Sequence, residues 1–223
     1  MLTFYGQPKF KSDETDLPPA GYELFIRERT ATGWQLPKDF NAITVEQLKA
    51  LLLKTILLMP TSVISIAFNL EPAQFIDHRY IDMIAEVQQT TSLMLSTELT
   101  ERADEQVTIQ QLVQAAKYFA ELDLQICIDD VGSGRNTLGL VLQLNKYVSE
   151  YKFACQNFRF AANFEQIIEI LDPWYALAKR HKKLFAIEGI ENAAELTLIQ
   201  NEYPCDIVQG YYTGKPAPLA LEV

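Results

Sequence analysis

Short apolar runs alternate with longer segments of helical periodicity along almost the whole of this chain. Seven runs rich in apolar and β-branched residues predict strands at residues 21–29, 63–68, 92–99, 124–128, 147–153, 184–187 and 207–212. Between them, apolar residues at spacings of three and four predict helices at residues 45–59, 72–89, 105–122, 136–144, 164–181 and 193–203. Residues 1–19 are interpreted as an entry segment. This alternation predicts an α/β fold with a parallel sheet, and seven strands in a chain of this length favour a sheet closed into a barrel.

The length of 223 residues suits one domain with a substantial core and lies near the lower end of what an eight-stranded α/β barrel needs. The composition, 48% hydrophobic and 22% charged, is that of an ordinary globular protein without disordered tracts. We therefore expect a single barrel domain over residues 1–223.

The net charge of -10 argues against binding to polymeric nucleic acid, because general affinity for nucleic acid comes from basic side chains that neutralise phosphates. An acidic protein still binds a small phosphodiester where metal ions bridge the charges. Cys127, Cys155 and Cys205 are too few and too scattered for a zinc framework or a disulfide scaffold. The apolar stretch 51–59 is too short to span a membrane, and no signal-peptide pattern opens the chain. We expect a protein of the reducing cytoplasm that does not bind membranes.

Oxygen-bearing side chains follow the apolar residues of five predicted strands. In chain order they are Asn69, Glu98 with Glu101, Asp129 with Asp130, Glu188 with Glu191, and Gln209. Because a parallel barrel gathers the C-terminal ends of its strands at one mouth, these side chains are expected to face one cleft. Carboxylates in one cleft repel each other and raise each other's pKa unless cations hold them.

The expected cations are metal ions with oxygen ligands. The two histidines, His78 and His181, lie away from the predicted strand ends, so that the ligand set suits Mg²⁺ or Mn²⁺ better than zinc. The adjacent Asp129 and Asp130 fit two ions about 3.5–4 Å apart, the arrangement of two-metal phosphodiester chemistry.

Each of these polar residues also has a purely structural interpretation. A lone acid at a strand end is usually solvated or caps a helix. Asp129 and Asp130 precede a glycine turn at residues 132–134, which resembles a phosphate-binding loop only weakly, and Asn69 suits a cap for the helix from Pro72. Separate structural explanations at five strand ends are less economical than one shared site.

Lys152 lies within the apolar strand predicted at residues 147–153, where burial of an ammonium without a partner is costly. Most such lysines extend the ammonium to solvent. Directed into the carboxylate cluster instead, Lys152 would hold and polarise an attacking water while its own charge is balanced.

Seven motifs in order make the chain resemble the EAL domain family, bacterial phosphodiesterases of cyclic di-GMP. They are Gln7 and Pro8, the signature at residues 23–27 with Glu-Leu-Phe in place of Glu-Ala-Leu, Asn69 and Leu70, Glu-Leu-Thr-Glu at 98–101, Asp-Asp-Val-Gly-Ser-Gly at 129–134, Glu-Gly-Ile-Glu at 188–191 and Gln-Gly-Tyr at 209–211. Each motif alone is weak, whereas their order over residues 2–216 is specific. The resemblance implies a TIM-like (β/α)8 barrel whose first strand is antiparallel to its neighbour.

The resemblance also implies roles for individual residues. Glu23, Asn69, Glu98 and Asp129 would bind one Mg²⁺ or Mn²⁺ ion, and Asp129 would bridge it to a second ion held by Asp130 and, through water, Glu188. Lys152 and Gln209 would position the water that attacks one phosphodiester of cyclic di-GMP to give linear pGpG. Arg27 would contact a substrate phosphate, Gln7 would contact the ligand nearby, and Glu101 would tether the loop after Asp130.

Three positions depart from the family pattern. Ala154 replaces the aspartate of the Lys-x-Asp motif, Val131 replaces a phenylalanine, and Arg135 replaces an aromatic residue after the loop. The alternatives to an enzyme are therefore a catalytically weak or inactive receptor for cyclic di-GMP and an EAL-like protein-interaction module. Retention of costly buried charges argues against the module. EAL domains often form homodimers, and by this analogy alone a homodimer is open to this chain.

Overall fold

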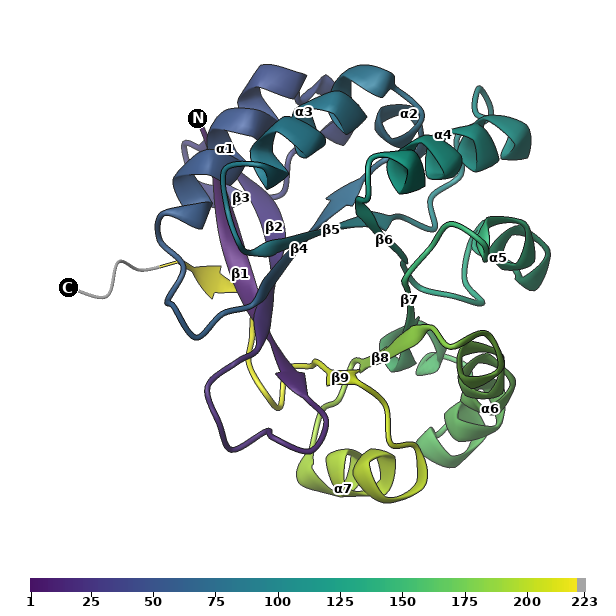
Figure 1. Ribbon diagram of the computed structural model, residues 1–223. Coiled ribbons are helices and arrows are strands. Elements are labelled where there is room, and N and C mark those ends of the chain that lie inside the picture. Colours follow the sequence, from purple (N-terminus) through teal and green to yellow (C-terminus); the bar gives the residue numbers. More distant parts are fainter. Residues whose placement is uncertain (220–223) are drawn as a thin grey trace.

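The computed structural model describes residues 1–219, and within them eight strands close into a barrel with helices on its outside (Figure 1). In order round the barrel the strands are β1 (Leu2–Lys11), β2 (Gly21–Thr30), β4 (Ser65–Leu70), β5 (Met94–Leu99), β6 (Gln125–Ile128), β7 (Glu150–Ala154), β8 (Leu184–Glu188) and β9 (Ile207–Val208), which pairs back with β1. The TIM-like barrel expected from the sequence is confirmed.

Strand β1 runs antiparallel to both of its neighbours in the barrel, whereas the other barrel strands are parallel to one another. Gln7 lies opposite Glu23 of β2, and Phe10 lies opposite Val208 of β9. The inverted first strand is thus as expected, but the interpretation of residues 1–19 as an entry segment is wrong. Gln7 and Lys9 are buried polar residues of β1, and they interrupt the apolar pattern by which a strand is recognised.

Two short strands lie outside the barrel, β3 (Gly33–Gln35) beside β2 and β10 (Ala217–Pro218) beside β1. The last predicted strand, 207–212, is shorter than expected, because residues 211–213 form a turn. The short strand β9 pairs with Phe10 and Lys11 of β1 and ends at Val208. Gln209 therefore lies just beyond the strand, at the barrel mouth.

The helices are α1 (Val45–Ile56), α2 (Pro72–Phe75), α3 (His78–Gln88), α4 (Ile109–Glu121), α5 (Leu138–Leu144), α6 (Phe164–His181) and α7 (Ala193–Glu202), with 3-10 turns at Phe40–Ala42 and Cys155–Phe158. Side-chain caps explain where they begin. Asp77 accepts a bond from the Arg79 backbone and starts α3, so that the single helix predicted at 72–89 is divided. Thr108 forms a capping box with Gln111, and α4 therefore begins at residue 109 rather than 105.

The apolar core lies mainly between the barrel strands and the surrounding helices, where residues such as Ile66, Phe119 and Ile187 are fully buried. The centre of the barrel differs, because charged side chains from several strands point into it. Among residues 1–219, no helix combines the length and apolar character needed to cross a lipid bilayer.

Candidate active site

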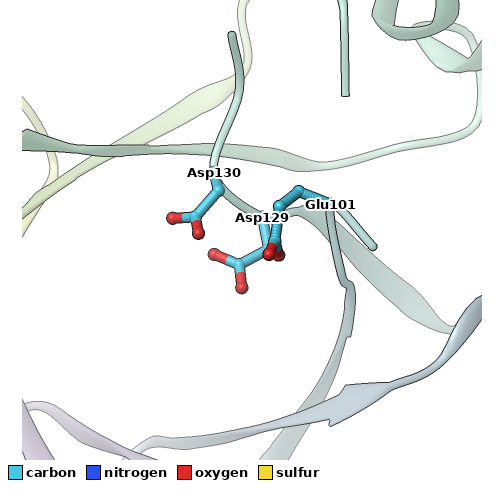
Figure 2. A group of neighbouring side chains, drawn as sticks. All are labelled: Glu101, Asp129 and Asp130. Atoms are coloured by element: carbon cyan, nitrogen blue, oxygen red, sulfur yellow. The ribbon is translucent and has the colours of Figure 1, made fainter. Parts of the chain in front are cut away.

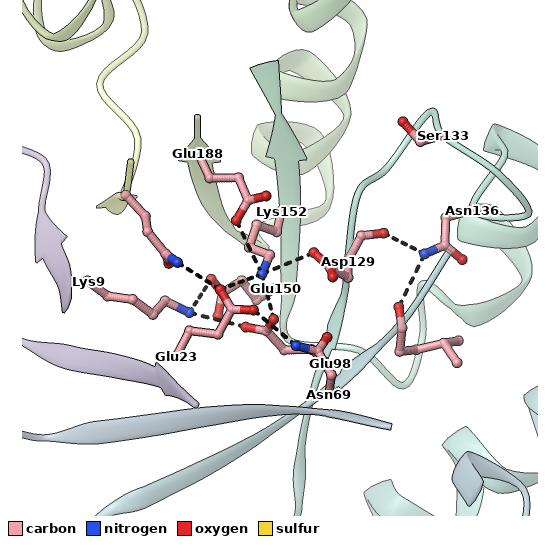
Figure 3. Close-up of polar contacts among 12 residues, drawn as sticks. Lys9, Glu23, Asn69, Glu98, Asp129, Ser133, Asn136, Glu150, Lys152 and Glu188 are labelled. Carbon is pink, nitrogen blue, oxygen red and sulfur yellow. Dashed lines mark hydrogen bonds and ion pairs between the residues drawn. The ribbon is translucent and has the colours of Figure 1, made fainter. Parts of the chain in front are cut away.

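The ammonium of Lys152 lies at the centre of the barrel, surrounded by carboxylates from four other strands or strand ends (Figure 3). Its Nζ is 2.5 Å from Glu98 Oε2, 3.0 Å from Glu23 Oε2, 3.0 Å from Asp129 Oδ1 and 3.3 Å from Glu188 Oε2. The side chain of Lys152 is 1% exposed. The sequence left open whether this lysine reaches solvent, and the structure places it inside the cluster.

The charges of this cluster perturb one another. Burial lowers the pKa of Lys152, but the four carboxylates, led by Asp129, raise it well above its ordinary value. Burial together with the Glu23 charge raises the pKa of Glu98 to about 7, although Lys152 and Lys9 oppose this shift. Burial also raises the pKa of Asp129, against the influence of Lys152. The site therefore holds more carboxylates than its ammonium groups can keep ionised.

Glu23 is held in its charged form, in contrast to Glu98 and Asp129. It accepts hydrogen bonds from Asn69 Nδ2 at 3.0 Å and from Gln209 Nε2 at 2.7 Å. Burial raises its pKa, but Lys152, Lys9 and the Gln209 amide together lower it below the ordinary value. Asn69 and Gln209, both predicted as site residues, are thus next to Glu23 at the same end of the barrel.

Glu101, Asp129 and Asp130 form a second acidic group (Figure 2), which shares Asp129 with the cluster around Lys152. Each offers one carboxylate oxygen, and the three oxygens lie within 4.8 Å of one another. Burial and the Glu188 charge raise the pKa of Asp130 to about 7. Glu101 also contacts the loop after Asp130 through its backbone, because its carbonyl accepts from Arg135 N at 2.8 Å.

The loop after Asp130 is closely packed. Asp130 has a positive φ of 48°, and Gly132 and Gly134 have φ values of 88° and 48°. A Cβ at Gly132 would lie 2.8 Å from Trp174 Nε1, and one at Gly134 would lie 2.3 Å from the Glu101 carbonyl oxygen, so both positions require glycine. Val131 is fully buried. The glycines serve this packing, in keeping with the turn interpretation of residues 132–134.

A cavity of about 510 Å³ opens above the cluster, and every predicted site residue except the fully buried Glu98 lines it. Gln7 is among them and donates from Nε2 to the Gly214 carbonyl at 3.0 Å. The Arg27 guanidinium lies 5.3 Å from the Tyr5 ring centroid and 5.8 Å from that of Phe25. The aromatic contacts hold the Arg27 charge on the wall of the cavity, while Gln7 joins β1 to the C-terminal segment.

Lys9 and Glu150 are buried site neighbours that the sequence pattern did not reveal. Lys9 Nζ is 3.5 Å from Glu98 Oε1 and 3.5 Å from Glu150 Oε1, so it contacts Glu98 on the opposite side from Lys152 (Figure 3). Because β1, β5 and β7 are not neighbours in the sheet, these contacts cross the barrel interior. Recognition of residues 2–11 as a strand would have placed Lys9 on the same face as Gln7.

Ala154, which replaces an aspartate of the family pattern, is followed by a turn whose polar side chains lie near the acidic cluster. Ala154 lies opposite Glu188 in the β7–β8 pairing and is buried. Gln156, in the 3-10 turn that follows, donates from Nε2 to Glu188 Oε1 at 2.6 Å, and Asn157 donates from Nδ2 to Ser133 Oγ at 3.3 Å in the loop after Asp130. A Cβ at Gly189 would lie 1.9 Å from Gln156 Oε1, so the loop after β8 is shaped around this glutamine. The neutral amide of Gln156 thus contacts a carboxylate beside the site of the missing aspartate.

The donor set of the cavity fits hard divalent cations. Carboxylates at the interior of the barrel and its mouth outnumber the two lysines, Lys9 and Lys152, that face them; the acids are Glu23, Glu98, Glu101, Asp129, Asp130, Glu150 and Glu188. Among the described residues, the buried oxygens Asn69 Oδ1, Asp130 Oδ1 and Gln209 Oε1 accept no hydrogen bond. Oxygen donors with free lone pairs and unbalanced charge are what Mg²⁺ and Mn²⁺ require.

The family model of the EAL domain matches residues 20–216. The chain belongs to the EAL domain family. The chain is also similar to the cyclic di-GMP phosphodiesterase NbdA of Pseudomonas aeruginosa, with 28% identity over 157 residues. That match covers 69% of this chain but only 19% of NbdA, so the chain spans about a fifth of the curated relative.

Solved structures of the EAL family share the fold. The PaMucR phosphodiesterase in complex with c-di-GMP has a TM-score of 0.79 at 22% identity, and the match covers 97% of this chain and 92% of that one. The Bacillus subtilis YkuI protein, an EAL domain protein in complex with its substrate c-di-GMP and calcium, has a TM-score of 0.77 at 19% identity, covering 99% of this chain and 57% of that one. At these identities the likeness shows the barrel.

Proposed function

We propose that this chain hydrolyses cyclic di-GMP to linear pGpG and that the reaction depends on two Mg²⁺ or Mn²⁺ ions. The observation that carries the proposal is the position of Lys152, whose ammonium contacts Glu23, Glu98, Asp129 and Glu188 at the floor of the cavity. Membership of the EAL family and the similarity to a named cyclic di-GMP phosphodiesterase support the same activity.

Each site residue then has a role in binding or in proton handling. Glu23, Asn69, Glu98 and Asp129 would hold one cation, while Asp129, Asp130 and Glu188 would hold the other. When bound, the two ions would lower the pKa of a water molecule and stabilise charge on the attacking and leaving oxygens. Lys152 and Gln209 would orient that water, because both donate to Glu23 beside it.

The substrate would lie across the cavity. Arg27, fixed on the cavity wall by Tyr5 and Phe25, would contact a phosphate, and Gln7 would support the neighbouring segment. Glu101 would couple the loop after Asp130 to the acidic group, since its carboxylate lies beside Asp129 and Asp130 and its carbonyl accepts from Arg135 N. The proposed setting is the cytoplasm, without polymeric nucleic acid or membrane as a partner; a homodimer is part of the proposal by family analogy.

A receptor that binds cyclic di-GMP without hydrolysing it is the second candidate. Ala154 favours it, because the side chain opposite Glu188 offers no polar atom to the site. The contact of Gln156 with Glu188 favours the enzyme, since it orients that carboxylate at the cavity.

Turnover decides between these candidates. With saturating Mg²⁺ or Mn²⁺, the protein is expected to convert cyclic di-GMP to pGpG, and a chelator is expected to stop the reaction. Glu23→Ala is expected to abolish turnover, because it removes a ligand and the acceptor shared by Lys152, Asn69 and Gln209. Chromatography of the nucleotides measures both. Tight binding by calorimetry without any product at micromolar enzyme would establish the receptor instead.

Gln156 provides a separate test of the second cation. Gln156→Met keeps the size of the side chain but removes the amide that donates to Glu188. Loss of such an outer hydrogen bond is expected to weaken the affinity for one of the two Mn²⁺ ions roughly tenfold and to leave the other unchanged. Calorimetric titration with Mn²⁺ measures this, with Gln143→Met on the exposed face of α5 as the matched control. Unchanged affinity for both ions would remove Gln156 from this role.

A further inference from the structure

Arg102, Glu71 and Phe40 form a group on the cavity wall to which neither the motifs nor the metal chemistry assigns a role. Arg102 directly follows Glu101, and all three residues line the cavity. Arg102 Nη1 donates to Glu71 Oε1, and the Arg102 guanidinium carbon lies 5.0 Å from the centroid of the Phe40 ring. The Arg102 side chain is 51% exposed, whereas that of Glu71 is 10% exposed.

The arrangement fixes the plane of the guanidinium while leaving most of its donors free. An arginine side chain has five N–H donors in a planar fork, and among the described residues only Nη1 of Arg102 has a hydrogen-bond partner. The Glu71 carboxylate and the Phe40 ring hold this fork in one orientation, which reduces the entropy lost when a ligand binds. The remaining N–H donors of Arg102 are therefore held in a defined orientation at the cavity wall.

The neighbourhood of Arg102 suits a flat heterocycle. Phe40 adds an aromatic face beside Arg102, and Leu36 is a further apolar residue of the cavity lining. Guanine presents two adjacent acceptors, O6 and N7, and a bidentate arginine is the commonest specific contact with them. Adenine presents N7 beside the N6 amino group, so that an arginine donor would meet another donor.

We propose that Arg102 binds the O6 and N7 edge of one guanine of cyclic di-GMP and thereby selects guanine over adenine in the ligand. Glu71 and Phe40 position the guanidinium for this contact. The inference rests on the proposed function, which supplies the nucleotide, and adds the residue that reads its base. Arg102 would therefore contact a base, whereas Arg27 would contact a phosphate.

The ratio of affinities for two cyclic dinucleotides separates a base contact from a phosphate contact. Cyclic di-GMP and cyclic di-AMP have the same phosphates and sugars, so an arginine bound to phosphate contributes equally to both. An arginine bound to O6 and N7 contributes to the guanine compound alone. Loss of one bidentate base contact, worth about 1–3 kcal/mol, corresponds to roughly a 5- to 150-fold change in affinity.

The experiment measures the dissociation constants of both dinucleotides by calorimetry for the whole chain and its variants in the presence of Ca²⁺. Arg102→Met is expected to weaken binding of cyclic di-GMP at least fivefold and binding of cyclic di-AMP less than twofold. Glu71→Gln weakens the contact that orients the guanidinium. It is expected to lower the affinity for cyclic di-GMP relative to cyclic di-AMP, but by a smaller factor than Arg102→Met. Arg79→Met is the control, because Arg79 pairs with Asp77 on the exposed end of α3 and does not line the cavity. Thermal melting confirms that each variant is folded.

Each result bears on the assignment. Equal weakening of both dinucleotides would show that Arg102 contacts phosphate or supports the loop, and unchanged binding of cyclic di-GMP would show that it contacts nothing in the ligand; either result overturns the proposal. Normal turnover by Arg102→Met with an unchanged affinity ratio would overturn the base contact alone and leave the phosphodiesterase intact. Failure of the wild-type protein to bind any cyclic dinucleotide would instead overturn the proposed function together with this inference.

Discussion

Replacement of Lys152 by methionine is expected to reduce turnover of cyclic di-GMP by roughly 10²–10⁴-fold, the range of a lost general acid or base. Methionine keeps much of the side-chain volume but has no ammonium, whereas Lys152 Nζ lies within 3.3 Å of four carboxylates. The variant therefore loses the group that orients the attacking water and the cation that balances these acids. Initial rates of pGpG formation at saturating Mn²⁺ measure the effect on kcat.

A control variant and a metal titration show whether the lost rate is due to Lys152 itself. Lys49→Met is the matched control, because Lys49 pairs with Glu86 on the exterior of the molecule, and its rate is expected to equal that of the wild type. Mn²⁺ titration of Lys152→Met establishes that the ions still bind at the concentration used. A Lys152→Met rate within threefold of the wild-type rate, with both ions bound, would contradict the role of Lys152 in positioning water.

Without divalent ions, the protein is expected to become less stable as the pH rises from 5 to 8. Glu98 and Asp130 have pKa values of about 7 in the folded chain, against ordinary values of 4.5 and 3.8. Between the ordinary and the raised values, the folded state binds more protons than the unfolded state, so the free energy of unfolding falls as the pH increases. A shift of this size in one group corresponds to roughly 3 kcal/mol. Urea denaturation in a chelator at pH 5.5 and pH 8 measures the difference.

Mn²⁺ is expected to reverse this trend, because it binds the ionised carboxylates and competes with protons for them. At about a thousand times its dissociation constant, a bound ion adds roughly 4 kcal/mol to the free energy of unfolding. The added stability is therefore expected to be larger at pH 8 than at pH 5.5. Asp130→Asn, which removes one of the two groups, is expected to flatten the pH dependence measured in chelator. Stability that increases with pH in the chelator would contradict the raised pKa values of Glu98 and Asp130.

The order of the strands and helices was readable from the sequence because it depends on local patterns. Apolar runs and helical spacing located most of the elements from residue 21 onward, and the helix predicted from residue 45 begins there because Thr44 caps α1. The pattern failed at residues 2–11, where Gln7 and Lys9 are polar residues buried in a strand. A strand whose inward face carries polar groups has no apolar alternation to reveal it.

The candidate site was partly readable for a related reason. Parallel strands in a barrel place their C-terminal ends together, so residues such as Asn69 and Asp129 at strand ends were expected to meet, and they line one cavity. Gln156 and Arg102 lacked any such marker. Their partners, Glu188 and Glu71, belong to other strands or loops, and amide or arginine side chains at loop positions are ordinary in a sequence.

The sequence by itself determined the alternation of strands and helices, the residues at the ends of most strands and the acidic character of the barrel mouth. Only the tertiary structure decided which charges meet. Lys152 contacts Glu98 across 54 residues and Glu23 across 129, and Lys9 contacts Glu98 across 89. These contacts exist because the closed barrel, with its inverted first strand, brings non-neighbouring strands face to face across its interior. No local periodicity encodes contacts of that kind, since each depends on the register and closure of the whole sheet.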